Sequence, residues 1–256
     1  MINVIFTCKG RPNLTELCLR RLTELMPPPY ELFICYDGDS PRYEHMLRET
    51  APDAIVIVNL HHVNRFELIN IALADSTGDV FMHVENDFYW ADPACLDAAL
   101  NAFHRYPRLD YIRFEHLPFT EKNYYSYNQV DGKDICWMKK DSPYQFTFNP
   151  HIRRFKYPTD KPFKTEGFTK QPEQHHNDGY KYHSACMTGD NFRHLGVFSE
   201  GGHFKPYYGE RFYNQRGKKI AGLNDVINEF GRLTDNLDYY DLFGRYLHDN
   251  WNKHST

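Results

Sequence analysis

The sequence of 256 residues lacks the features that mark several classes of protein. It has no excess of positive charge, because 30 Lys and Arg stand against 34 Asp and Glu and the net charge is −4. A chain without a cationic field loses the main electrostatic attraction to a phosphate backbone, which argues against nucleic acid as a partner. No run of 18 apolar residues occurs and the first residues lack a basic segment, so we expect a soluble, cytoplasmic protein without a transmembrane segment.

The motifs of several enzyme classes are also missing. No G-x-S-x-G, H-E-x-x-H, P-loop or G-x-G-x-x-G motif occurs, which excludes hydrolases with a nucleophile elbow, zinc proteases and P-loop NTPases. The 6 cysteines form no C-x-x-C pair and lie mostly inside apolar runs, which favours a reducing compartment. Without an internal repeat or a Gly/Ser linker, the chain is expected to form a single domain.

Aromatic side chains, in contrast, are abundant, with 19 Tyr, 19 Phe and 3 Trp. Tyr combines an apolar ring with a polar hydroxyl, so this excess either fills a core or lines a groove for polar, ring-shaped ligands. Composition alone does not choose between the two.

Short apolar runs alternate with amphipathic stretches over the first 115 residues. Strands are expected at 3–7, 31–36, 54–59, 79–84 and 109–114. Helices are expected at 14–25, 43–50, 66–76 and 93–106, the last with Asp92 as its N-cap and Pro93 at its first position. This alternation is typical of a doubly wound, mostly parallel α/β sheet flanked by helices.

Regular patterning stops in the second part of the chain. Residues 116–222 are rich in Tyr, Phe, Pro and Lys with strand-like pieces only at 144–148 and 181–187, so we expect long functional loops. Lys and Arg outnumber the acids between 139 and 181, which indicates either a basic lid or a solvated face. Residues 223–256 have helical spacing and are expected to pack back on the domain or to join two copies in a homodimer.

Polar loops follow three of the expected strands. Thr7–Asn13 follows the first, Asp37-Gly38-Asp39-Ser40 the second, and Glu85-Asn86-Asp87 the strand at 79–84. Ligands of open α/β sheets bind outside the carboxyl ends of the strands, where carboxylates suit Mg²⁺ or Mn²⁺ beside a phosphate. Taken alone, Glu85-Asn86-Asp87 is equally explained as a turn.

In this order and spacing the loops resemble those of the nucleotide-sugar glycosyltransferases of GT-A fold, particularly family 2. The resemblance covers about residues 3–115 and implies a single GT-A domain, with a nucleotide-sugar half (1–115), an acceptor half (116–222) and a helical tail (223–256). It implies transfer of a hexosyl unit from a nucleoside diphosphate sugar to a hydroxyl of a glycan or a lipid-linked saccharide, with inversion. A carbohydrate-binding or inactive module and a sugar nucleotidyltransferase stay open as alternatives.

The resemblance also implies roles for particular residues. Those expected at the nucleotide and donor sugar are Thr7, Lys9, Arg11, Asp37, Asp39, Asn70, Glu85, Asn86, Asn149 and Arg153. The chain departs from the family pattern in having Glu85 at the first acidic position and Leu68-Ile69 where Ala-Arg ordinarily precedes the equivalent of Asn70.

Metal binding and base catalysis are assigned in the same way. Asp87 is expected to bind Mn²⁺ or Mg²⁺, and the further candidate ligands are Glu85, His194 and His203. An inverting transfer needs a general base for the acceptor hydroxyl. The order of motifs favours Glu166 for this role, with Asp190 second.

Overall fold

The computed structural model describes residues 1–9, 12–59, 65–114, 124–139, 149–154, 183–189, 191–194, 212–213 and 219–220. Strands and helices alternate over the first part of the chain: β1 (Ile2–Cys8), α1 (Pro12–Leu25), β2 (Tyr30–Tyr36), α2 (Pro41–Thr50), β3 (Ile55–Val58), α3 (Arg65–Asp75), β4 (Val80–Glu85), β5 (Phe88–Trp90), α4 (Ala94–Arg105) and β6 (Tyr111–Phe114). The later described elements are the strands β7 (Tyr124–Val130), β8 (Lys133–Met138), β9 (His151–Arg154), β10 (Ser184–Met187), β11 (Phe192–His194), β12 (Phe212–Tyr213) and β13 (Lys219–Ile220). The alternation expected up to residue 114 is therefore confirmed.

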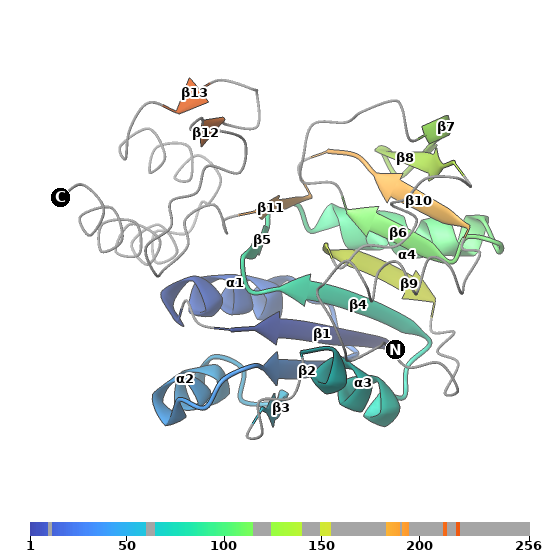
Figure 1. The fold of residues 1–256 in the computed structure, drawn as a ribbon. Coiled ribbons are helices and arrows are strands. Elements are labelled where there is room, and N and C mark those ends of the chain that lie inside the picture. The colour runs from blue at the N-terminus through green and yellow to red at the C-terminus, as the bar shows by residue number, and fades with distance from the viewer. Residues whose placement is uncertain are drawn as a thin grey trace.

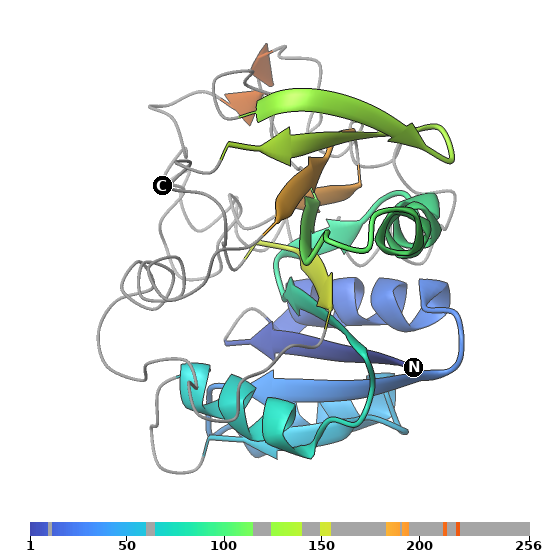
Figure 2. The ribbon, with the colours of Figure 1, turned by 90° about the vertical axis from the view of Figure 1, so that its right-hand side faces the viewer.

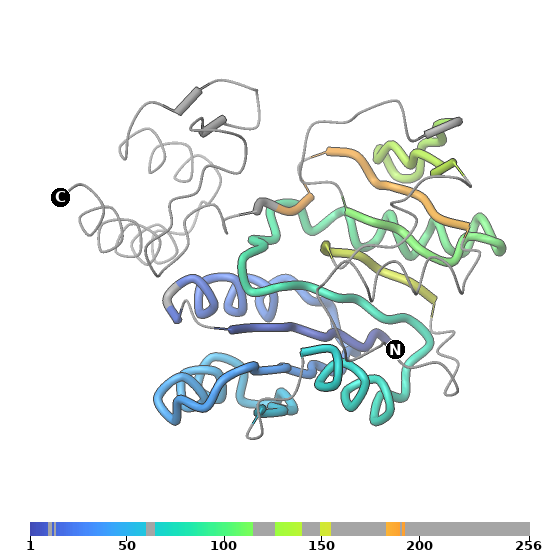
Figure 3. The backbone as a smooth tube through the Cα atoms, in the orientation of Figure 1, coloured from blue at the N-terminus to red at the C-terminus, as the bar shows by residue number. Residues whose placement is uncertain are grey.

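The main sheet has nine strands in the order β3-β2-β1-β4-β9-β6-β10-β8-β7 (Figure 1). The pairings show that β8 and β9 run opposite to the other seven strands. Seven of the nine strands thus share one direction, as expected, whereas the pairings made by β8 and β9 are antiparallel. Figure 3 shows β9 lying between β4 and β6, although it follows them in the chain.

The helices cover both faces of the sheet, as the sequence pattern requires. Alternate residues of β1 point to opposite faces, so that Val4 and Phe6 join one core while Ile5 joins the other. Helices α1, α2 and α4 pack on the first face and α3 on the second. Figure 2 shows α1 and α4 on one side of the strands and α3 on the other. No helix of the described ranges is long and apolar enough to cross a bilayer.

The hairpin of β7 and β8 was not expected from the sequence. Its turn is Asp131-Gly132, and both residues have positive φ, at 50° and 77°. Such two-residue turns match the right-handed twist of paired strands, and Asp-Gly is their preferred sequence. This dipeptide is the local sequence signal for the hairpin. The hairpin is tied to α4 by a hydrogen bond from Asn101 Nδ2 to Asp131 Oδ2 of 2.5 Å.

Two other local expectations need correction. Strand β9 was not expected, because His-Ile-Arg-Arg contains a single apolar residue, Ile152; it forms because β4 and β6 supply ladder partners on both sides. The N-cap of α4 is Pro93 rather than Asp92. The Asp92 carboxylate nevertheless accepts from Ala94 N at 3.0 Å, so Asp92 provides the side-chain hydrogen bond to the first turn of the helix. The strand expected at 181–187 is confirmed as β10, whereas 144–148 and the tail 223–256 lie outside the described residues.

Candidate functional site

Three strand ends meet at one edge of the sheet. In the register of β1 with its two neighbours, Thr7 lies opposite Cys35 of β2 and Glu85 of β4. The ladder continues beyond the strands, because Asp37 N donates to Cys8 O and Asn86 N to Thr7 O, each at 2.9 Å. The loops after β1, β2 and β4 therefore start from one fixed row of backbone groups.

At one end of this edge, Asp37 is held by two partners. Its Oδ1 accepts from Asn59 Nδ2 at 2.7 Å, and its Oδ2 pairs with Lys9 Nζ at 2.8 Å. Asn59 is only 2% exposed and its own N–H donates to Tyr36 O, whereas the Lys9 side chain is 75% exposed. Each carboxylate oxygen has further lone pairs, so Asp37 can also accept from a ligand N–H or O–H. Asn59 was not predicted, although its place at the end of β3 repeats the pattern of the other loops.

The loop after Asp37 is shaped by aromatic packing. Tyr36 stacks on Tyr43 with ring centroids 4.4 Å apart, and the Tyr36 hydroxyl accepts from Ser40 N at 3.2 Å. A Cβ on Gly38 would lie 2.5 Å from that hydroxyl, so only glycine fits there. Asp39, in contrast, is exposed beside the N-cap of α2.

At the other end of the edge, Glu85 pairs with Arg65, Nη1 to Oε1, at 3.2 Å. Glu85 is the last residue of β4 and Arg65 the first of α3, so this helix begins at the same edge. Arg65 was not predicted. It lies one helical turn before Ile69, the position at which the family pattern ordinarily has Arg. Asn70 is half-buried within the same helix.

The Asn86 side chain points into the fold rather than to the open edge. It is buried, and its Nδ2 donates to Thr15 Oγ1 at 2.7 Å. Thr15 is in turn hydrogen-bonded to the hydroxyl of Tyr43, and burial raises the pKa of that hydroxyl above its usual value. A buried polar network between α1 and α2 thus anchors the turn that carries Asp87. The structure does not bring Asn86, expected at the nucleotide, together with the other side chains of the edge.

Asp87 occupies the turn between β4 and β5 and is half-buried. Strand β11 pairs with β5 so that His194 lies opposite Phe88, the residue after Asp87. The backbone thereby brings His194, one of the expected metal ligands, next to the Asp87 turn. His203 lies outside the described residues.

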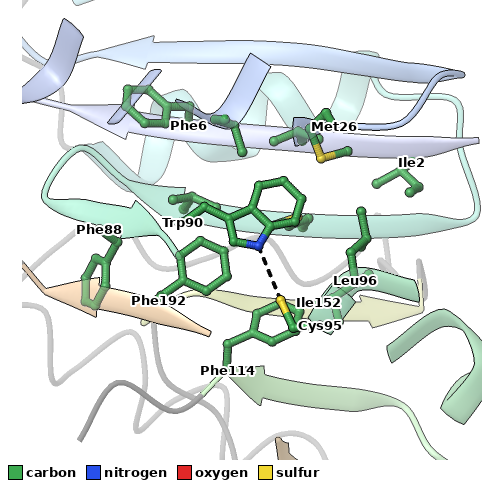
Figure 4. Packing of buried hydrophobic residues seen from close by; sticks show 14 of the residues in the cluster. Ile2, Phe6, Met26, Phe88, Trp90, Cys95, Leu96, Phe114, Ile152 and Phe192 are labelled. Carbon is green, nitrogen blue, oxygen red and sulfur yellow. Dashed lines mark hydrogen bonds between the residues drawn. The ribbon is translucent and has the colours of Figure 1, made fainter. Parts of the chain in front are cut away.

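An aromatic cluster holds this pairing in place. Trp90 of β5 stacks on Phe192 of β11 with ring centroids 5.8 Å apart, and the ring centroid of Phe114 in β6 lies 5.3 Å from that of Phe192. Figure 4 shows these rings together, with a hydrogen bond from Trp90 Nε1 to Cys95 Sγ of 3.3 Å. The cluster explains how a segment a hundred residues later reaches the Asp87 turn.

The residues that flank Asp190, the second candidate for the base, lie at the same edge. β10 runs parallel to β6, so its carboxyl end lies on the side of the Asp87 turn. Asn191 is fully buried, its carbonyl accepts from Ala91 N at 3.0 Å, and its Nδ2 donates to Met187 O at 3.0 Å. Asp190 itself lies outside the described residues, as do Glu166 and Arg11.

Two expected donor-site residues lie at different depths along β9. Asn149 precedes the strand, on the side of its first residue His151, which pairs with His83 of β4, and it therefore lies towards the open edge. Arg153 pairs with Phe81 and is buried, with its guanidinium 4.7 Å from that ring. Phe81 is four residues before Glu85, about 13 Å along the strand at ~3.3 Å per residue, so Arg153 is not brought to the edge.

Residues 3–179, more than half of the chain, match the family model of Glycosyl transferase family 2. The chain belongs to glycosyl transferase family 2. The resemblance inferred from the strand-end loops is therefore confirmed. No curated protein matches the sequence.

Several solved structures share the fold of this family 2 chain. TarS 1–349 from S. aureus aligns with a TM-score of 0.57 and 12% identity, covering 77% of this chain and 61% of its own. The mannosyltransferase PcManGT from Pyrobaculum calidifontis, solved with GDP-Man and Mn²⁺, aligns with a TM-score of 0.58 and 14% identity over 96% of this chain and 69% of its own. Glucosyl-3-phosphoglycerate synthase from Mycobacterium tuberculosis aligns with a TM-score of 0.50 and 12% identity over 73% and 68%. These similarities confirm the expected GT-A architecture.

The side chains at this edge suit a metal ion that is held jointly by the protein and by substrate phosphates, rather than by protein ligands alone. Within the described ranges, no three His, Cys, Asp or Glu side chains gather to hold an ion. Mg²⁺ and Mn²⁺ are hard cations that are often bound by one or two carboxylates together with substrate phosphates and water. A carboxylate in a turn at the open edge, as in Asp87, fits that mode.

Proposed function

We propose that this chain transfers a hexosyl unit from a nucleoside diphosphate sugar to an acceptor hydroxyl. One observation carries the proposal: the ends of β1, β2 and β4 bring the Lys9–Asp37–Asn59 cluster and the Arg65–Glu85 pair to one edge, beside Asp87. The first group suits a nucleoside and the second a diphosphate. Membership of glycosyl transferase family 2 supports glycosyl transfer as the reaction.

The nucleoside is expected to bind at Asp37. Its carboxylate is oriented by the buried amide of Asn59, so it presents acceptor lone pairs in a fixed direction. Such a group accepts from a base N–H or a ribose hydroxyl. Thr7, expected at the nucleotide, is buried, and its Oγ1 lies 3.2 Å from His83 Nε2 of β4.

The diphosphate is expected between Asp87 and Arg65. Asp87 would hold Mn²⁺ or Mg²⁺, with His194 as the neighbouring candidate ligand. When bound, the ion would neutralise charge on the departing nucleoside diphosphate. Two structural neighbours were solved with Mn²⁺ and a nucleotide sugar, GDP-Man in one and UDP-Glc in the other, which supports this choice of ligand.

The acceptor is expected in the half formed by residues 116–222. A glycan or lipid-linked saccharide would lose a hydroxyl proton to Glu166 or Asp190, and the sugar would be transferred with inversion. The strand-end position of the residues around Asp190 supports the second candidate.

None of the six cysteines is in a disulfide and all are buried, which supports a reducing compartment such as the cytoplasm.

Calorimetric binding of UDP, GDP, ADP and CMP, with Mn²⁺ and with EDTA, tests the proposal. We expect one nucleoside diphosphate to bind, and to bind more tightly with Mn²⁺. The matching nucleotide sugar should then be hydrolysed slowly without acceptor. Glu166→Gln and Asp190→Asn identify the base, because the responsible variant should lose transfer and keep nucleotide affinity. If no nucleotide binds, the proposed function is wrong; tight binding without any turnover would indicate an inactive module.

A further inference from the structure

The two acids that flank Asn86 have different surroundings. Glu85 lies in the ladder at the end of β4, opposite Thr7, and its carboxylate is 3.2 Å from the guanidinium of Arg65. Asp87 lies in the following turn. A metal ion on Glu85 would have to compete with a cation already in place, and the two positive charges would repel each other. This arrangement favours Asp87 over Glu85 as the metal ligand.

The guanidinium of Arg65 is oriented from two sides. Glu85 accepts from Nη1, and the Phe66 ring lies 5.1 Å from the guanidinium carbon. The side chain remains 35% exposed, compared with 22% for Glu85. A guanidinium carries five N–H donors in a planar fork, so it can bind a carboxylate and a phosphate at the same time. An oriented, partly exposed arginine at the open edge is therefore suited to an anionic ligand.

The length of the Glu85 side chain fits this arrangement. A glutamate has one methylene more than the aspartate of the usual family pattern, and its carboxylate reaches across from β4 to the first turn of α3. The same helix lacks the arginine that ordinarily occurs at the position of Ile69. Arg65, one turn earlier, supplies a positive charge from the same helix.

We propose that Arg65 binds the diphosphate of the donor and that Glu85 is the positioning residue for Arg65 rather than a metal ligand. This inference rests on the proposed function and adds a contact that does not need the metal. The donor diphosphate would be held by two independent elements, Arg65 at the start of α3 and the ion on Asp87. A measurable part of diphosphate binding must then persist in EDTA and depend on Arg65.

Calorimetry with the better bound of UDP and GDP, and with the corresponding nucleoside, tests the arginine. In EDTA, Arg65→Gln should weaken binding of the diphosphate on the order of tenfold, as expected for a lost hydrogen bond to a charged group, and leave nucleoside binding within about twofold. The matched control is Arg48→Gln, which removes the Arg48–Glu44 pair on α2 and should change neither affinity. Equal diphosphate binding by Arg65→Gln and wild type would overturn the proposal.

Glu85→Gln tests the other half. We expect the gain in affinity on adding Mn²⁺ to survive in this variant and to disappear in Asp87→Asn. Loss of the gain in Glu85→Gln would make Glu85 a metal ligand. The double variant tests whether Glu85 positions Arg65. Arg65→Gln should lower diphosphate affinity less when Glu85 is already Gln, whereas additive losses of affinity would contradict the positioning role. If wild type binds no nucleoside diphosphate at all, the proposed function fails together with this inference; if wild type binds and Arg65→Gln binds equally, only the inference fails.

Discussion

The two ends of the strand-end edge are built on different principles. At the proposed nucleoside end, Asp37 has an exposed charged partner, Lys9, but also a neutral, buried one, the side-chain amide of Asn59, whose backbone N–H continues the ladder to Tyr36 O. At the diphosphate end, Glu85 meets a charged and partly exposed partner, Arg65. A neutral buried partner defines direction, whereas an exposed ion pair can exchange partners with a charged ligand. From this difference we expect the direction of hydrogen bonds to decide binding at one end and charge at the other.

Substitution of Asp87 is expected to have the largest effect, a loss of turnover. Asp87→Asn removes the proposed metal ligand, and metal-ion stabilisation of a leaving group is worth several kcal/mol, so we expect turnover to fall on the order of a hundredfold or more. Donor hydrolysis and transfer rates in Mn²⁺ measure this. The control is Asp75→Asn, an exposed acid at the other end of α3. Full activity of Asp87→Asn would contradict the assignment.

Loss of the Asn86 amide should affect stability more than chemistry. Asn86→Ala removes one of the hydrogen bonds of the buried Thr15 hydroxyl, which is expected to cost about 1–3 kcal/mol in the free energy of unfolding. Urea unfolding followed by circular dichroism measures the loss. The measurement distinguishes a structural role of Asn86 from a role in ligand binding. Unchanged stability with reduced nucleotide binding would place Asn86 at the ligand.

The nucleoside end is tested by Asn59→Ala. Asp37 would lose the partner that orients it, and we expect affinity for the nucleoside to fall about tenfold, since hydrogen bonds to charged groups are worth ~1.5–3 kcal/mol. Calorimetry with uridine and guanosine measures this, and a melting curve checks that the variant is folded. An equal loss for inorganic pyrophosphate would show that the two ends are not separate.

The smallest effect is expected at Lys9. Its pair with Asp37 is largely exposed, and such pairs contribute only ~0.2–1 kcal/mol, so Lys9→Gln should lower nucleoside affinity by no more than about fivefold. This loss should shrink as salt is added, because exposed charges are screened. A titration series over ionic strength provides the measurement. A loss larger than that of Asn59→Ala would reverse the roles that we assign to the two partners of Asp37.

Much of the fold could be predicted because its signals are local. Apolar runs and helical spacing located the strands and helices up to residue 114, and the rule for strand ends brought Asp37 and Asp87 to one edge. Two of the differences between expectation and structure have a common cause. Strand β9 and the direction of Asn86 depend on neighbours far away in the chain, and no local pattern records them. The β7–β8 hairpin differs, because its Asp131-Gly132 turn is a local signal that the sequence does contain.

The sequence by itself determined the α/β class, the position of the acidic loops at strand ends and the family, since these follow from periodicity and motif order. Only the tertiary structure decided which partner each acid has. Asn59 with Asp37 and Arg65 with Glu85 are pairs 22 and 20 residues apart, and His194 reaches the Asp87 turn through the β5–β11 pairing. The physical reason is that hydrogen bonds and ion pairs act over a few ångströms in space, and chain distance carries no record of that proximity.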